Sequence, residues 1–320
     1  MSSYKENGCR LCPRQCGADR AGGKRGVCGC TDEIRVARAA LHMWEEPCIS
    51  GETGSGAVFF AGCPLHCIFC QNRAISGGNA GKTVSIARLT EIFLELQDKG
   101  AANVNLVTAG HYALSVAEAV REAKRQGLTV PVVWNSGGYE RVETLSEIAD
   151  VIDIWLPDLK YLRAETAEAF SHAADYPEVA KRAIDFMVKT AGNPVFVGTE
   201  SGKAIVDGAE SGRPVSDGAG YMKRGVIVRH LVLPGHSEES KEIVSYLHGT
   251  YGNRIWLSLL NQYTPPAEKL PYPELNRRLT TYEYDKVVDF ALSLGVENAY
   301  IQERSAAGER YIPVFDGEGV

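Results

Sequence analysis

The sequence predicts an α/β fold, organised as one large barrel domain with an appendage. The chain has 320 residues, which is too long for one small core and suits a barrel. From residue 57 onward, short apolar runs alternate with amphipathic stretches, a pattern typical of parallel βαβ units. Polar residues or glycines follow the apolar runs, and barrels of this kind carry their sites at the ends of their strands.

The expected strands and helices alternate along the chain. Residues 34–42 are expected to form a short strand or hairpin before the barrel, and residues 194–221 a surface loop or lid, because that segment is rich in Gly, Ser and Asp. The barrel strands are predicted at residues 57–61, 104–108, 130–135, 152–156, 226–233, 255–260 and 299–302. The helices are predicted at residues 85–99, 114–126, 142–149, 177–190, 238–250 and 280–294.

Composition and charge narrow the classes of function. The formal net charge is −6 without a basic stripe, so we expect no nucleic-acid partner. We expect no membrane partner either, since no apolar run reaches transmembrane length and the N-terminus lacks the apolar region of a signal peptide. These features predict a cytoplasmic protein. In that reducing setting the 9 cysteines, most of them clustered, indicate metal rather than disulfides.

The loop directly after the first expected barrel strand carries three of these cysteines. Cys63, Cys67 and Cys70 have C-x3-C-x2-C spacing. A four-iron cluster held by protein alone needs four thiolates, so three from one loop leave an iron open to a ligand, as catalytic metal sites do. One alternative is a zinc site completed by a distant ligand; close to the three cysteines, only His66 could supply a fourth ligand. The other alternative is three buried structural cysteines.

This loop resembles that of the radical S-adenosylmethionine (SAM) superfamily, in which three cysteines bind a [4Fe-4S] cluster whose fourth iron chelates SAM. The preceding Gly62 and the following Gln71-Asn72 make it similar to homologues of pyruvate formate-lyase-activating enzymes. The run Glu45–Gly51 suits an uncharacterised branch of those homologues. The resemblance implies a partial (β/α)6 TIM-like barrel, open on one side, with a Cys-rich N-terminal extension.

The resemblance also implies a reaction. A one-electron donor such as flavodoxin or ferredoxin reduces the cluster, which cleaves SAM to methionine and a 5′-deoxyadenosyl radical that abstracts hydrogen from the substrate. Cys63, Cys67 and Cys70 are the implied catalytic and metal-binding residues. The first idea for the substrate is a glycyl-radical protein such as pyruvate formate-lyase. The alternatives are another peptide or a small molecule, and a non-catalytic metal-binding adaptor in which both cysteine groups are structural.

Other strand ends supply the expected SAM pocket. Asp158-Leu159-Lys160 and the fifth-strand run with Arg229 match runs that border SAM in activating enzymes. Asn135-Ser136 stands where those enzymes carry an acid, and Thr108-Ala109-Gly110 where they carry Gly-Gly-Glu. The Thr108 hydroxyl, backbone carbonyls or His111 are the candidates to replace that carboxylate. The predicted cofactor-binding residues are Thr108, Gly110, Asn135, Ser136, Asp158, Lys160 and Arg229; taken singly, each also suits a turn or a helix cap.

A second group of cysteines lies near the N-terminus, in a segment rich in glycine and poor in apolar side chains. Such a segment depends on bound metal or on docking for its order. The preferred ligands are Cys9, Cys12, Cys16 and Cys28, and both zinc and an auxiliary iron–sulfur cluster suit four thiolates. Free thiols packed beneath a loop are the alternative. Cys48 is predicted to be a buried apolar residue.

The expected domain organisation follows from these features. Residues 1–50 form the Cys-rich metal-binding extension, residues 51–305 the radical SAM partial barrel, and residues 306–320 a C-terminal tail.

Overall fold

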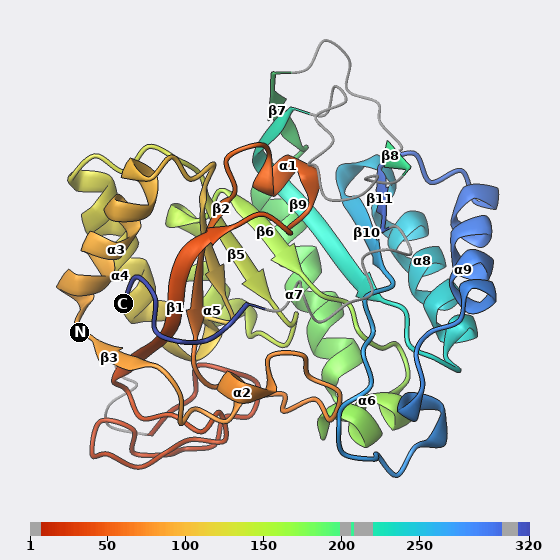
Figure 1. Ribbon diagram of the computed structural model, residues 1–320, viewed down its shortest axis with the longest axis horizontal. Coiled ribbons are helices and arrows are strands. Elements are labelled where there is room, and N and C mark those ends of the chain that lie inside the picture. Colours follow the sequence, from red (N-terminus) through yellow and green to blue (C-terminus); the bar gives the residue numbers. More distant parts are fainter. Residues whose placement is uncertain (1–7, 199–205, 208–219, 303–312) are drawn as a thin grey trace.

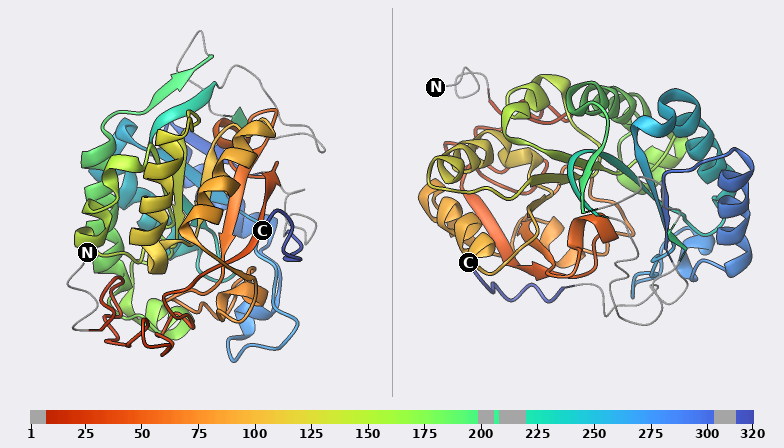
Figure 2. Two further views of the ribbon diagram at one scale, coloured as in Figure 1. Left: turned by 90° about the vertical axis from the view of Figure 1, so that its left-hand side faces the viewer. Right: turned by 90° about the horizontal axis from the view of Figure 1, so that it is seen from above.

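The computed structural model describes residues 8–198, 206–207, 220–302 and 313–320. Parallel strands form the centre of the molecule, with helices along one face of the sheet (Figures 1 and 2). The two ends of the sheet do not pair with each other within these described ranges, so the predicted open, partial barrel is confirmed. Its parallel strands, in spatial order, are β2 (Ser55–Phe60), β4 (Val104–Val107), β5 (Val132–Ser136), β6 (Ile154–Pro157), β9 (Tyr221–Leu231), β10 (Trp256–Leu260), β11 (Ala299–Ile301) and β8 (Val206–Asp207).

Antiparallel strands extend this sheet. The expected strand before the barrel is β1 (Ile34–His42), which pairs with β2 and with β3 (Lys82–Val84). The C-terminal residues 313–320 lie along β1, where the Ala39 N–H donates to the Glu318 carbonyl at 2.9 Å. The predicted loop at residues 194–221 instead begins with a strand, β7 (Val195–Val197), which pairs with β9; residues 199–205 and 208–219 lie outside the described ranges.

The predicted helices are present, and their ends have local causes. The Ser85 hydroxyl caps the first turn of α3 by accepting from the Arg88 N–H, and Thr280 and Glu283 form a capping box at α9. Within the described ranges, no helix is both long and apolar enough to cross a lipid bilayer. The helices are α2 (Arg73–Ser76), α3 (Ile86–Asp98), α4 (Ala113–Arg125), α5 (Val142–Ser146), α6 (Ala164–Ser171), α7 (Tyr176–Ala191), α8 (Ser237–Tyr251) and α9 (Thr281–Ser293). Of these, α2 and α6 were not predicted.

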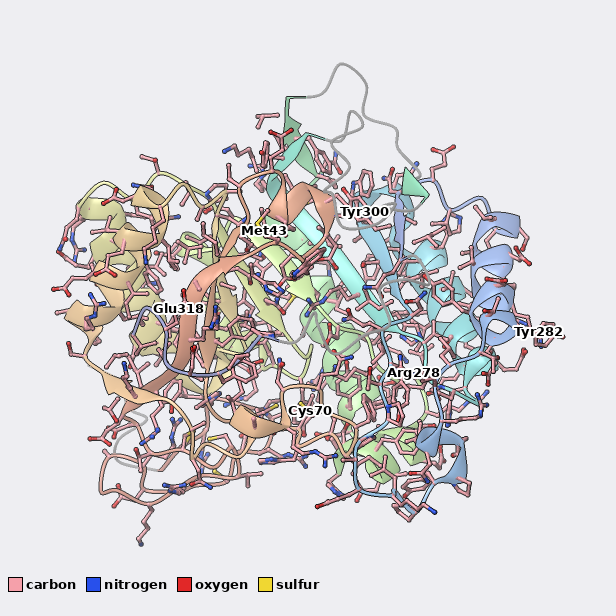
Figure 3. The ribbon with its side chains drawn as sticks, in the orientation of Figure 1. Met43, Cys70, Arg278, Tyr282, Tyr300 and Glu318 are labelled. Atoms are coloured by element: carbon pink, nitrogen blue, oxygen red, sulfur yellow. The ribbon has the colours of Figure 1, made fainter. Side chains whose placement is uncertain are left out.

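A short helix, α1 (Pro47–Ser50), closes the end of the barrel where the parallel strands begin (Figure 1). Its Cys48 and Ile49 side chains are buried against the inward-facing Ile154 and Ile227. The burial of Cys48 agrees with its prediction as an apolar residue. Cys70 lies toward the opposite end from Met43 and Tyr300 (Figure 3). The carboxyl ends of the strands therefore stay available for a site.

We predict that Ile49→Ala lowers the free energy of unfolding by about 2 to 5 kcal/mol, because it leaves a cavity where a fully buried side chain closed the barrel. Urea unfolding followed by circular dichroism measures the change. Leu292→Ala, on the outer face of α9 with 47% of the residue exposed, is the control and should change stability by no more than about 0.5 kcal/mol. Equal effects of the two substitutions would contradict a closing role for α1.

Candidate functional site

The cysteine loop leaves β2 through a glycine that no other residue can replace easily. Gly62 has φ +93°, and a Cβ at this position would lie 2.4 Å from the Cys30 sulfur. His66 turns the loop with φ 51°, and the Cys70 N–H donates to the Cys67 carbonyl at 3.0 Å. The loop therefore returns on itself at the carboxyl end of β2, which brings its three cysteines to the rim of the barrel.

The thiols of this loop are largely withdrawn from solvent. Burial raises the pKa of Cys63 to about 11 and the pKa of Cys70 to about 12. Backbone N–H groups of Leu65 and Asn72 and the ammonium of Lys160 lower these pKa values, but less than burial raises them. Both thiols consequently hold their protons at neutral pH, and a metal that binds them must displace those protons.

A single metal ion and a cluster require different spacings of their sulfur ligands. A tetrahedral zinc ion holds its sulfurs at about 2.3 Å, and so about 3.8 Å from one another, whereas the thiolates of a cubane bind different irons and lie farther apart. In the part of the chain that the structure describes, no group of three or more His, Cys, Asp and Glu side chains is arranged to hold a metal ion. Three thiols with N–H and O–H donors directed at their sulfurs match the ligands that [4Fe-4S] clusters use.

Four of the predicted pocket residues meet inside the barrel around one guanidinium. Arg229 on β9 donates from Nε to Asp158 Oδ1 at 2.9 Å and from Nη2 to Asn135 Oδ1 at 2.5 Å. Lys160 Nζ lies 2.6 Å from Asp158 Oδ2. Glu45, from the segment before α1, completes the group, with Oε2 3.4 Å from Arg229 Nη1. The ends of β5, β6 and β9 thus converge on one buried ionic network.

The charges in this network explain the directions of its pKa shifts. Burial alone would raise the pKa of Asp158, but Arg229 and Lys160 together lower it. Burial dominates at Glu45 and Glu46, and raises both of their pKa values despite the attraction of Arg229. Three carboxyl groups therefore face two cations in this region; Glu46 is buried, and Glu45 and Asp158 are half-buried. Glu46 Oε2 is buried without a hydrogen-bond partner among the described residues.

Two of the other predicted pocket residues, Gly110 and Ser136, lie beside Glu140. Thr108 has φ 61°, an unusual backbone conformation for a β-branched residue. Ser136 Oγ donates to Glu140 at 2.7 Å, and Trp134 Nε1 donates to the same carboxyl group at 2.8 Å. A Cβ on Gly110 would lie 3.0 Å from Glu140 Oε1. Glu140 therefore places a carboxyl group beside Gly110, at the strand end where activating enzymes carry Gly-Gly-Glu and this sequence has no carboxylate.

Burial raises the pKa of Glu140 to about 7, and hydrogen bonds from Ser136 and Trp134 only partly oppose this. Sequence reasoning missed Glu140 because it follows the pocket run rather than standing in it. It missed Glu45 because that residue precedes the barrel. A pair of adjacent glutamates before the apolar α1 segment was the available signal for Glu45.

His111 was a candidate to replace the missing Gly-Gly-Glu carboxylate. It is buried, and its Nε2 lies 2.8 Å from the Ala61 carbonyl.

The N-terminal cysteines lie near one another and against the cysteine loop. A Cβ on Gly26 would be 3.3 Å from the Cys16 sulfur and 3.5 Å from the Cys28 sulfur. Cys12 is close enough to Cys28, Cys9 and Cys16 for these thiols to add to the burial that raises its pKa to about 11. Cys28 is buried, whereas Cys16 is exposed.

Three contacts join this extension to the cysteine loop. The Cys63 N–H donates to the Cys28 carbonyl at 3.2 Å, and His66 Nε2 lies 2.6 Å from the Val27 carbonyl. Arg14 Nε donates to the Pro64 carbonyl at 2.9 Å. The extension therefore supports the cysteine loop directly.

We predict that Arg229→Met lowers the free energy of unfolding by about 3 to 5 kcal/mol at pH 8, because it leaves Glu45 and Asp158 buried without their guanidinium. The loss should shrink on acidification. In the variant the folded-state pKa values of these carboxyls rise above the unfolded ones, so the penalty disappears as the pH falls toward the unfolded values near about 4. Wild type meanwhile loses the contribution of Asp158, whose folded-state pKa is lowered. Urea titrations at several pH values measure the difference.

Arg121→Met is the control for this prediction. Arg121 pairs with Asp150 on the surface, with 39% and 59% of their side chains exposed, and its removal should cost at most about 1 kcal/mol. A loss at Arg229 that stays constant between pH 8 and pH 5 would argue against buried carboxylates as its cause.

Comparison with known proteins bears on this site. The model of the Radical SAM superfamily matches residues 57–207. The uncharacterised protein MJ0674 of Methanocaldococcus jannaschii is 27% identical over 300 residues, which cover 91% of this chain and 76% of that protein. Pyruvate formate-lyase 1-activating enzyme of Escherichia coli is 27% identical over 112 residues, which cover 33% of this chain and 46% of that enzyme.

Among solved structures, this chain is similar to Streptococcus suis SuiB bound to S-adenosylmethionine. The similarity covers 75% of this chain and 48% of the SuiB chain, with 12% sequence identity and a TM-score of 0.47. The superfamily match includes the cysteine loop and the strand ends that carry Asp158 and Lys160. A match to this superfamily implies a [4Fe-4S] cluster and SAM as cofactors. The similarity to the Radical SAM superfamily thus extends over residues 57–207 of this chain.

Proposed function

We propose that this chain reductively cleaves SAM at a [4Fe-4S] cluster held by Cys63, Cys67 and Cys70. The observation that carries the proposal is the placement of three thiols on one loop, at the carboxyl end of β2 and beside Lys160. Three protein ligands leave one iron open for SAM. When bound, the cluster supplies one electron to the sulfonium of SAM, and the resulting cleavage provides the radical that abstracts hydrogen.

The chain's own residues bind and orient the cofactor in this proposal. Lys160, held at 2.6 Å by Asp158, offers a cation beside the loop for an anionic group of SAM. Arg229 fixes Asp158 and Asn135 at the ends of their strands, so their positions do not depend on the ligand. Phe69, 7% exposed, limits the access of water to the cluster. An electron donor of the flavodoxin or ferredoxin class completes the system.

For the substrate, we propose a glycyl-radical protein, so that this chain is an activating enzyme. The likeness of 112 residues to pyruvate formate-lyase 1-activating enzyme supports this choice. Radical modification of another peptide or of a small molecule is the second candidate, favoured by Thr108-Ala109-Gly110 in place of Gly-Gly-Glu. The third candidate is not an enzyme but a metal-binding adaptor, which would catalyse no reaction.

We predict that the anaerobically reconstituted and reduced chain forms 5′-deoxyadenosine from SAM, and that Cys67→Ala abolishes this, because the loop then offers two thiolates. Liquid chromatography of the quenched reaction measures the product. Cys48→Ala, at a buried cysteine outside both cysteine groups, is the matched control and should retain activity. An intact, reduced cluster without product would count against cleavage in the absence of substrate, and no cluster at all would favour the adaptor.

We also propose that the N-terminal extension, residues 1–50, holds a second metal through Cys9, Cys12, Cys16 and Cys28, as zinc or as an auxiliary cluster. The grouping of Cys12 with the other three supports a shared site. The sulfurs of the exposed Cys16 and the buried Cys28 would lie 3.3 Å and 3.5 Å from a Cβ on Gly26, which places both sulfurs beside the same residue.

We predict that Cys12→Ala removes this second metal while the cluster of the loop remains, since the two groups share no cysteine. Elemental analysis for zinc, iron and sulfide, compared with wild type, measures the loss. Cys30→Ala is the control, because Cys30 is buried beside the same segment but lies outside the proposed ligand set. Wild-type protein without metal beyond the loop cluster would refute the second site.

A further inference from the structure

A pair of hydroxyl groups reaches the cysteine loop from the side of α6. Ser171 Oγ, at the last residue of α6, lies 3.0 Å from the Cys67 sulfur. The Tyr161 hydroxyl lies 2.8 Å from Ser171 Oγ on the other side. Both residues are 0% exposed, so neither hydroxyl donates to bulk water. Tyr161, Ser171 and Cys67 form a continuous chain, which we call the hydroxyl relay.

A metal-bound Cys67 fixes the direction of this relay. A thiolate ligand has no proton and can only accept a hydrogen bond, so Ser171 must donate to Cys67. The single hydroxyl proton of Ser171 is then committed, and its oxygen accepts from Tyr161. Donation by Tyr161 polarises the Ser171 hydroxyl and strengthens its bond to the sulfur.

Tertiary contacts hold α6 in the position that this bond requires. Glu239 Oε1 accepts from two backbone N–H groups at the start of the helix, each at 2.9 Å. At its end, the Phe170 carbonyl accepts from the Ile68 N–H of the cysteine loop at 2.9 Å. Arg14 Nη2 donates to the Ser171 carbonyl at 3.0 Å. Ser171 is therefore clamped against the loop by contacts that do not involve its hydroxyl.

Cys67 differs in this respect from its two neighbours. Backbone N–H groups serve Cys63 and Cys70, and a side-chain substitution leaves such donors in place. Cys67 receives its donor from a side chain, Ser171. A substitution at Ser171 therefore removes the hydrogen bond to Cys67 without changing the backbone path of the loop.

We propose that the hydroxyl relay sets the reduction potential of the cluster, with Ser171 as a positioning residue and Tyr161 as its support. The inference rests on the proposed function, because it concerns a cluster bound through Cys67. Reduction adds one electron, from a one-electron donor protein or from dithionite, and no proton leaves the relay. The added negative charge strengthens a hydrogen bond to sulfur, so the donor stabilises the reduced state and raises the potential.

The test uses the full chain, reconstituted anaerobically, as wild type, Ser171→Ala, Tyr161→Phe and the double variant. Redox titration followed by electron paramagnetic resonance measures the midpoint potential. Ser171→Ala should lower the ratio of reduced to oxidised cluster at a fixed potential about tenfold, a shift of about 59 mV to more negative potential for one electron. Tyr161→Phe should shift the potential less, in the same direction. The double variant should match Ser171→Ala, because Tyr161 acts through Ser171.

Two control variants separate this effect from general damage. Ser293→Ala removes a hydroxyl that also stands at the last residue of a helix, where it donates to the Phe290 carbonyl at 2.8 Å. Tyr251→Phe removes a tyrosine hydroxyl from a buried residue of α8. Both should leave the midpoint potential unchanged, and circular dichroism of all variants should match wild type.

The possible results distinguish this inference from the proposed function. Wild-type protein that assembles no cluster overturns both. A wild-type cluster that cleaves SAM, together with an unshifted potential in Ser171→Ala, overturns the relay alone. Additive shifts in the double variant also overturn it, since Tyr161 would then act independently. If Ser171→Ala fails to fold, Tyr161→Phe decides by itself, and an unchanged potential in that variant refutes the relay.

Discussion

A guanidinium buried inside the barrel is the constraint on which the polar interior depends. Removing a charge from water costs several kcal/mol unless partners compensate it, so Arg229 requires acceptors at its own depth. Asp158, Asn135 and Glu45 supply them from β6, β5 and the segment before α1. The same segment carries α1 into the barrel. The Arg229 side chain therefore connects the segment that closes one end of the barrel with the strand ends at the open rim.

The cysteine loop buries Leu65 and Phe69 in the core, and hydrogen bonds with other elements fix the position of its backbone. Support comes from two sides. The N-terminal extension bonds to its backbone through the Cys28 carbonyl and Arg14, and the end of α6 bonds to it through Phe170 and Ser171. Arg14 reaches both the loop and α6. The loop is thus held between two elements that the barrel alone would not provide.

Local patterns predicted the barrel strands within a few residues, because parallel strands that are covered on both faces are apolar runs between turns. Features that depend on partners far away in the sequence were not predicted. β9 begins at Tyr221, before the expected residue 226, because β7 pairs with its first residues. α6 has its N-terminal acceptor on α8, at Glu239. Asp158, Lys160, Asn135 and Arg229 do meet as a group, whereas Glu45, Glu140 and Ser171 join polar groups that sequence spacing does not bring together.

Two carboxyl groups at neighbouring strand ends show how the fold assigns charge. Asp158 and Glu140 are both half-buried, and their partial removal from water disfavours ionisation of each. Two cations face Asp158 and keep it ionised, whereas Trp134 and Ser136, which are neutral, face Glu140, so the pKa of Glu140 rises to about 7. A cation brought beside Gly110 would therefore change the charge of Glu140 but not that of Asp158. Different partners thus lower the pKa of one carboxyl group and leave the pKa of the other raised.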